Sequence, residues 1–92
     1  MKILDKVKLS LMIPLDEHYA DIELKAHINS CKELIKSTGV SNTVIEAGVG
    51  LVEALILIYC KTFFGFKSDG SVKELPPSFD FLLRQLVLTK GE

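Results

Sequence analysis

The feature that most constrains the fold is the nearly apolar segment 51–65, LVEALILIYCKTFFG. At 100° per residue its apolar side chains cover most of the circumference of a helix, and only a narrow stripe is left for water. A helix that is apolar on nearly all sides is typical of the centre of a small bundle, where other helices cover it. The segment therefore predicts an all-α protein, a small four-helix bundle around one central apolar helix. The stripe left for water consists of Glu46, Gly50, Glu53, Leu57 and Lys61.

Two further helices are predicted before the central one. Residues 2–13 fit either an amphipathic helix or a half-buried strand. We favour the helix, because Leu, Lys and Met are good helix formers and no later segment offers a partner strand. Pro14 then ends this helix. The next helix is predicted over 17–37, with Asp16 as its N-cap and Gly39 as its left-handed stop.

The boundaries of the last two helices depend on glycine and proline. Gly48 and Gly50 lower the helix propensity, so the central helix can begin anywhere from residue 43 to residue 51, and we expect an early start with a weak first turn. Pro77 as a first-turn residue or Ser78 as an N-cap opens a last helix, FDFLLRQLVL. Residues 89–92 are expected to form a frayed tail.

Size and composition predict one globular domain over residues 1–92. The chain is 48% hydrophobic and 25% charged, which is typical of a folded protein. Its formal net charge of −1 provides no strong field for phosphate backbones and argues against a dedicated nucleic-acid binder. Cys31 and Cys60 each lie within an apolar helical pattern, which favours buried reduced thiols over a disulfide.

Catalytic and metal-binding patterns are weak throughout the chain. His18, His27, Cys31 and Cys60 are residue types that bind zinc, but no CxxC or HxxxH pair supplies half of a site. No nucleophile beside a base, carboxylate pair or glycine-rich phosphate loop is evident, because the short GVG string at 48–50 lacks a preceding strand and a following lysine. We expect no enzyme activity, no cofactor and no metal.

Two other functional classes remain open from the residues alone. A span over 44–66 would be long enough to cross a membrane and would suit a holin-like phage protein, although Glu46, Glu53 and Lys61 would then lie in or near the hydrocarbon. A small helical DNA-binding regulator would use the two helices around Gly39, but the second of them has no arginine and one lysine with which to read a groove.

The order of the segments and four short strings resemble the small head-tail connector proteins, the neck adaptors of tailed bacteriophages and prophages. The strings are LDKVKLSL, DIELKAHINSCKELIKSTGV, YCKTFFG and ELPPSFDFLLRQLVL. The resemblance covers nearly the whole chain. Its motifs are packing and turn patterns, and no catalytic residue is among them.

The resemblance implies a structural virion protein of the neck, assembled in the host bacterial cytoplasm and not bound to membrane. About twelve copies would form a closed ring between portal and tail, through which DNA passes without specific binding. The implied partners are the portal protein and the head-completion, stopper or tail proteins.

Contact residues for such partners are expected in exposed loops and at the C-terminus, because these can order on a partner at small cost to the core. These segments can equally be plain solvent-exposed connections. The candidate partner contacts are Lys67, Ser68, Asp69, Gly70, Ser71, Val87, Leu88, Lys90 and Glu92. The candidate contacts between subunits lie outside the core stripes and are Ile22, Glu53, Leu57 and Lys61.

Overall fold

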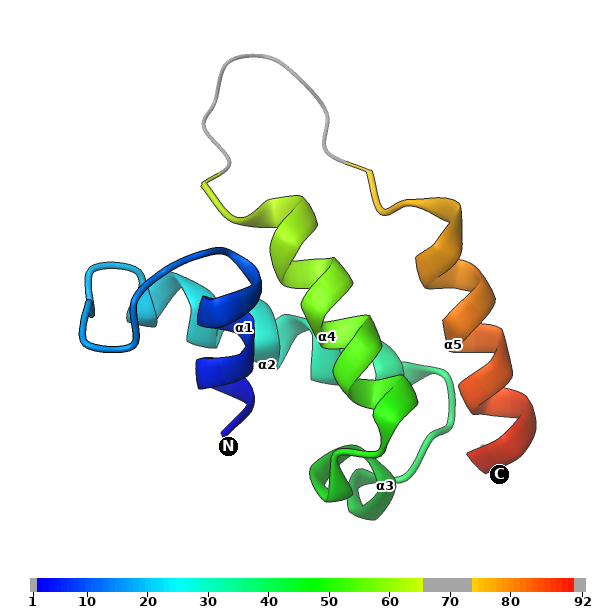
Figure 1. The fold of residues 1–92 in the computed structure, drawn as a ribbon. Helices are drawn as coiled ribbons and strands as arrows, with labels where there is room; N and C mark the ends of the chain where they lie inside the picture. Colours follow the sequence, from blue (N-terminus) through cyan, green and yellow to red (C-terminus); the bar gives the residue numbers. More distant parts are fainter. Residues whose placement is uncertain (1, 66–73, 91–92) are drawn as a thin grey trace.

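The computed structural model describes residues 2–65 and 74–90, and within them the chain forms five helices and no strand (Figure 1). The predicted all-α class is therefore confirmed. The simpler four-helix bundle is not, because the segment before the central helix forms a short helix of its own. The helices are α1 (Ile3–Ser10), α2 (Asp21–Ser37), α3 (Asn42–Ala47), α4 (Gly50–Phe63) and α5 (Pro77–Lys90).

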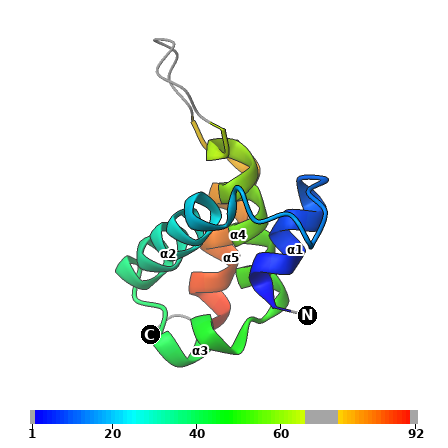
Figure 2. The same ribbon diagram turned by 90° about the vertical axis from the view of Figure 1, so that its left-hand side faces the viewer.

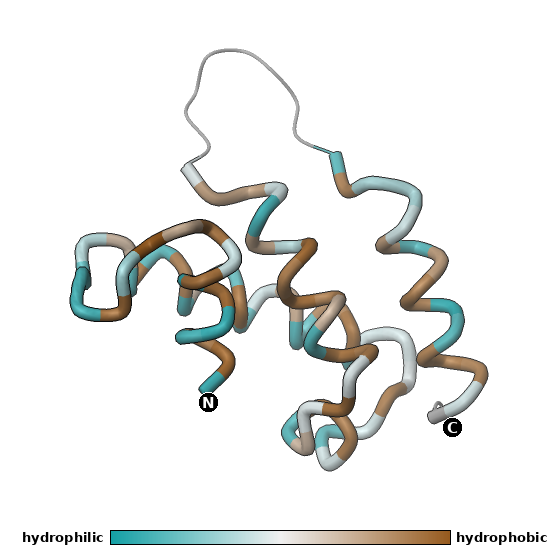
Figure 3. Tube along the Cα trace, in the orientation of Figure 1, coloured by the Kyte–Doolittle hydropathy of each residue, from teal (hydrophilic) through white to brown (hydrophobic). Residues whose placement is uncertain are grey.

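Helix α4 is the centre of the molecule, as its apolar sequence predicts. It packs against α1, α2 and α5. Figure 1 shows α1 on one side of α4 and α5 on the other, with α2 crossing behind α4, and Figure 2 shows α1 and α2 on opposite sides of α4. Most of α4 is coloured as hydrophobic in Figure 3. The side chains of α4 that are fully buried are Val52, Leu55, Ile56 and Cys60.

The connection between α1 and α2 is longer than expected. Helix α1 confirms the preference for helix over strand, but α2 begins at Asp21, so the predicted start at residue 17 and the capping role of Asp16 are wrong. Residues 14–20 instead form turns, in which the amide of Glu17 donates to the carbonyl of Pro14 at 3.0 Å. The N-cap position of α2 is Ala20, whose side chain cannot cap.

The expected early start of the central helix is also wrong. Ser41 caps the short helix α3 by accepting a hydrogen bond from the amide of Val44 at 3.3 Å. Gly48 then adopts a left-handed conformation with φ of +67°, which ends α3 and turns the chain before Gly50 begins α4. The segment 44–66, considered above as a membrane span, is thus divided between two helices.

Helix α5 begins with Pro77 in its first turn, as predicted. Phe79 and Leu86 are buried against α4. The helix continues to Lys90, so Thr89 is helical and does not belong to a frayed tail. Residues 91–92 of the predicted tail lie outside the described residues.

Candidate protein-docking site at the α1–α2 turn

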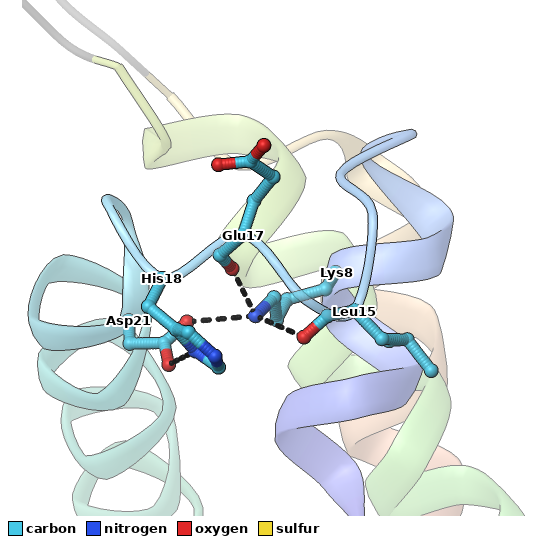
Figure 4. Close-up of polar contacts among 5 residues, drawn as sticks. All are labelled: Lys8, Leu15, Glu17, His18 and Asp21. Atoms are coloured by element: carbon cyan, nitrogen blue, oxygen red, sulfur yellow. Dashed lines mark hydrogen bonds and ion pairs between the residues drawn. The ribbon is translucent and has the colours of Figure 1, made fainter.

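The best-defined polar cluster of the molecule surrounds the side chain of Lys8 on α1, which is only 1% exposed. Its Nζ lies 3.2 Å from the carbonyl oxygen of Leu15, contacts the carbonyl oxygen of Glu17, and lies 3.0 Å from Oδ1 of Asp21 (Figure 4). An ammonium group is costly to remove from water unless such partners replace the water. Lys8 therefore fixes the turn to both α1 and α2.

Asp21 completes this cluster at the first residue of α2. Its Oδ2 lies 2.8 Å from Nδ1 of His18, while Oδ1 faces Lys8 (Figure 4). The hydrogen bond with His18, and after it the contact with Lys8, lowers the pKa of the Asp21 carboxyl below its ordinary value. The negative charge of Asp21 also interacts favourably with the dipole at the N-terminus of α2, where no side-chain cap is present.

The anchored turn and the first turn of α2 carry four exposed apolar side chains, Met12, Leu15, Tyr19 and Ile22, which together we call the turn surface. The exposed fraction is 91% for Met12, 73% for Tyr19 and 85% for Ile22. Met12 also has a left-handed backbone with φ of 61°, which costs about 1–2 kcal/mol for an L-residue. A buried charge and a strained backbone thus hold apolar side chains in water, an arrangement typical of a protein-interaction surface.

A second exposed apolar surface lies on α5. Phe81 and Leu88, both exposed, are seven residues apart and share one helical face. Beside this face is a groove of about 400 Å³ between α5 and the end of α2, which we call the α5 groove. Its lining residues are Thr38, Asp80, Leu83, Arg84, Val87 and Leu88.

A larger cavity of about 570 Å³ lies between the start of α1, α2, α3 and α4. Ion pairs border it: Nζ of Lys6 lies 2.8 Å from Oε2 of Glu53, and Nζ of Lys32 lies 3.5 Å from Oε1 of Glu46. Glu53 and Glu46, which belong to the stripe predicted to face water, therefore contact neighbouring helices. The Lys6–Glu53 pair joins α1 to α4, and the Lys32–Glu46 pair joins α2 to α3.

The structure separates the predicted subunit contacts. Ile22 is exposed in the turn surface, and Lys61 is exposed on α4. Glu53 forms an ion pair with Lys6, and Leu57 is half-buried and packs against the core. Glu53, Leu57 and Lys61 follow one another at four-residue spacing along one face of α4, whereas Ile22 lies on α2 and belongs to the turn surface.

Among the predicted partner contacts, Val87 and Leu88 line the α5 groove. Lys90 is the last residue of α5. Residues 67–71 and Glu92 lie outside the described residues, so their contacts stay a prediction.

Sequence reasoning missed the turn surface and the anchoring lysine. A signal for Lys8 was present, because Leu4, Lys8 and Leu11 are spaced at four and three residues and share one helical face. A lysine between two core leucines indicates a buried charge that needs carbonyl or carboxylate partners.

The four residues considered for zinc are dispersed. His18 pairs with Asp21, and His27 lies 3.0 Å from Oε2 of Glu23. Cys31 and Cys60 are free and buried in the core, and burial raises the pKa of each thiol to about 12. Over residues 2–65 and 74–90, no group of three His, Cys, Asp or Glu side chains could hold a metal ion.

Of the helices formed by the described parts of the chain, none combines the length and apolar character that a bilayer-crossing helix requires.

Exposed apolar side chains on a small all-α fold are typical of proteins that dock to other proteins. A model of the phage connector protein family matches residues 3–92, and the chain belongs to this family. The family is a structural one and not a family of enzymes. Neither a search of curated proteins nor a search of solved structures gave a match.

Proposed function

We propose that this phage connector protein is a component of the virion neck, where it forms a ring between the portal and the tail. The observation that carries this proposal is the family match over residues 3–92. In the proposed assembly about twelve copies close into a ring through one repeated head-to-tail contact. The partners are the portal protein on one face and a head-completion, stopper or tail protein on the other, and assembly takes place in the host cytoplasm.

The two exposed apolar surfaces support this proposal physically. A connector copy has to bind its neighbours in the ring as well as proteins above and below, so it needs more than one docking surface. The turn surface and the α5 groove lie on different elements, with α4 between them (Figure 1). Exposing Met12, Ile22 and Leu88 to water is unfavourable, and a docked partner would cover these side chains.

The charge balance fits a channel through which DNA passes without specific binding. A net charge of −1 leaves the chain without the excess of lysine and arginine that would hold passing phosphates. We expect duplex DNA to run unretarded with the purified protein at moderate salt. Salt-sensitive binding to DNA would contradict this part of the proposal.

Co-sedimentation with portal rings of the same phage tests the proposed function. We expect the wild-type chain to sediment with the rings at a fixed ratio and to remain in the supernatant without them or with an unrelated ring protein. Failure to associate with the portal and with the stopper, by a chain whose helical circular dichroism is intact, would contradict the neck assignment.

A further inference from the structure

We propose that the cavity between the start of α1, α2, α3 and α4 binds an acidic segment of a neighbouring protein of the neck. We call it the lysine cavity, after Lys2, Lys25 and Lys32 in its lining. This inference rests on the proposed function and specifies the chemistry of one partner surface, which presents aspartate or glutamate beside an aliphatic side chain. The lysine cavity shares no lining residue with the α5 groove and contains none of the turn surface.

The charges of the lysine cavity do not balance. Its lining contains three lysines and two glutamates. Nζ of Lys6, which approaches from outside the lining, donates to both carboxylate oxygens of Glu53 at 2.8 Å. Glu46 pairs with Lys32 at 3.5 Å, a longer contact than the about 2.8 Å of a strong ion pair. Both acids therefore have a cation already, and the cavity keeps an excess of positive charge.

This excess comes from Lys2 and Lys25, neither of which forms an ion pair with another described residue. Asp21 precedes Lys25 by four residues and is the acid that helical spacing would pair with it. Asp21 instead contacts Lys8 and His18, because it anchors the turn. The anchoring of the turn thus leaves the ammonium group of Lys25 available to an acid from outside the molecule.

The floor of the lysine cavity is apolar. Val52 is fully buried there, Ile45 and Ile56 are each 2% exposed, and the half-buried Ile3 and Leu4 add an apolar wall. The start of α1, α3 and the start of α4 lie together at one end of the molecule (Figures 1 and 2). A bare phosphate would leave this floor uncovered, whereas an aliphatic side chain would bury apolar surface on it.

The volume of about 570 Å³ is sufficient for such a segment. An engineered protein cavity of roughly 150 Å³ already holds a benzene ring, so the lysine cavity has room for an aliphatic side chain and adjoining backbone.

The positions of the lysines favour a segment that carries more than one acid. Lys25 and Lys32 are seven residues apart on one face of α2, which places their backbone positions about 10 Å from each other. Lys32 can exchange its long contact with the exposed Glu46 for a shorter one with the partner. The lysines would attract an acidic segment and repel a basic one, while the apolar floor adds contact area.

Charge reversal at Lys25 tests the proposal. Lys25→Glu should lower the amount of chain that sediments with portal or stopper rings several-fold, because the new carboxylate repels the acidic segment. Lys36→Glu is the matched control, exposed on the same helix but outside the lining, and should bind like the wild type. Lys25→Arg keeps the charge and should also bind like the wild type. Sodium chloride should weaken binding of the wild type more than binding of Lys25→Glu.

Filling the cavity tests its apolar part separately. Ala47 is exposed on α3 and lines the cavity, so Ala47→Trp occupies part of the volume without changing the charge. Ala26→Trp, at an exposed position of α2 outside the lining, is the control. We expect Ala47→Trp to bind the rings several-fold less than Ala26→Trp. Circular dichroism and urea denaturation verify that each variant is folded.

The outcomes distinguish this inference from the proposed function. A wild-type chain that binds neither portal nor stopper rings would overturn both. A folded Lys25→Glu variant that binds both rings as the wild type does would overturn the inference alone. An effect of Lys25→Glu confined to self-association without rings, or to retardation of duplex DNA, would also overturn it, because the cavity would then serve a second copy or phosphates.

Discussion

The two ends of the molecule present apolar surfaces in different ways. At the turn end, a buried ammonium and a carboxylate with lowered pKa fix the backbone through polar contacts. At the other end, α5 is held by apolar packing of Phe79 and Leu86 against α4, including a Tyr59–Phe79 ring pair with centroids 6.2 Å apart. The position of the turn therefore depends on a few charges and so on pH, whereas the position of α5 depends on how well the core is filled.

The largest expected effect tests the apolar end. Leu86→Ala removes a fully buried side chain between α5 and α4 and should lower the free energy of unfolding by about 3 kcal/mol, because the cavity left behind collapses only in part. Urea denaturation followed by circular dichroism measures this. Leu88→Ala, two residues further along and 80% exposed, is the matched control and should change stability by at most about 0.5 kcal/mol. Equal losses from both would contradict the packing described for α5.

The second effect tests the polar end. Lys8→Met keeps the length of the side chain but leaves two carbonyl groups and the Asp21 carboxylate without their cation, and should cost about 2 kcal/mol. Amides of residues 11–20 should exchange with deuterium faster, by more than the overall loss of stability explains. Lys6→Met is the control on the same helix. Because its pair with Glu53 is partly exposed, it should cost less than about 1 kcal/mol.

A smaller effect on stability is expected when the pH is lowered. The hydrogen bond from the amide of Gly65, and then His27, lowers the pKa of Glu23 below 4.5. This carboxylate therefore contributes stability above its unfolded pKa and loses it as the pH falls through the lowered folded value. The proton resonance of the Gly65 amide should titrate with a midpoint below 4.5, and Glu23→Gln should abolish that titration. A midpoint at or above 4.5 would show that the Glu23–Gly65 contact does not persist in solution.

The same titration sharpens the comparison of the two ends. The pKa of Asp21 is lowered from 3.8, so its stabilising contribution is also present at neutral pH and lost in acid. Protection factors, which correct for the intrinsic slowing of amide exchange in acid, should therefore decrease at residues 14–21 on acidification before they decrease in α5. A simultaneous decrease in both would argue against separate anchoring.

The smallest effect on stability is expected from Tyr19→Ala. Its side chain is 73% exposed, so the free energy of unfolding should change by at most about 0.5 kcal/mol. Its binding to portal rings should nevertheless fall below that of the wild-type chain, because the removed ring belongs to the exposed turn surface that supports the proposed function. Sedimentation measures the binding and urea denaturation the stability. A variant that binds portal rings like the wild type would show that docking does not depend on Tyr19.

The central helix and the start of the last helix were predictable because they depend on local properties. The apolar circumference of residues 51–63 specifies burial whatever surrounds it, and Pro77 restricts the backbone directly. The predicted end of the first helix at Pro14 is wrong, because α1 ends at Ser10 and Met12 has a left-handed backbone. The break at Gly48 was not predictable, since a glycine can adopt both a helical and a left-handed backbone and the sequence does not distinguish them. The structure shows the left-handed conformation, with φ of +67°.

The candidate site was less predictable than the fold. Ile22 was identified from its position outside the core stripe and Leu88 from its place near the C-terminus, and the structure exposes both. The importance of Lys8 depends on carbonyl groups seven and nine residues away that fold back onto its Nζ. That geometry arises from the turn as a whole, and the helical period of α1 could indicate only that the lysine faces inward.

Hydrogen exchange of the assembled chain, compared with the free chain, tests most directly whether this connector works by docking its anchored turn onto other proteins. We expect the amides of residues 12–22 to exchange more slowly on portal rings than in the free protein, together with those of α5, while α4 changes little. Unchanged exchange at both ends in a chain that is bound to the portal would contradict the account.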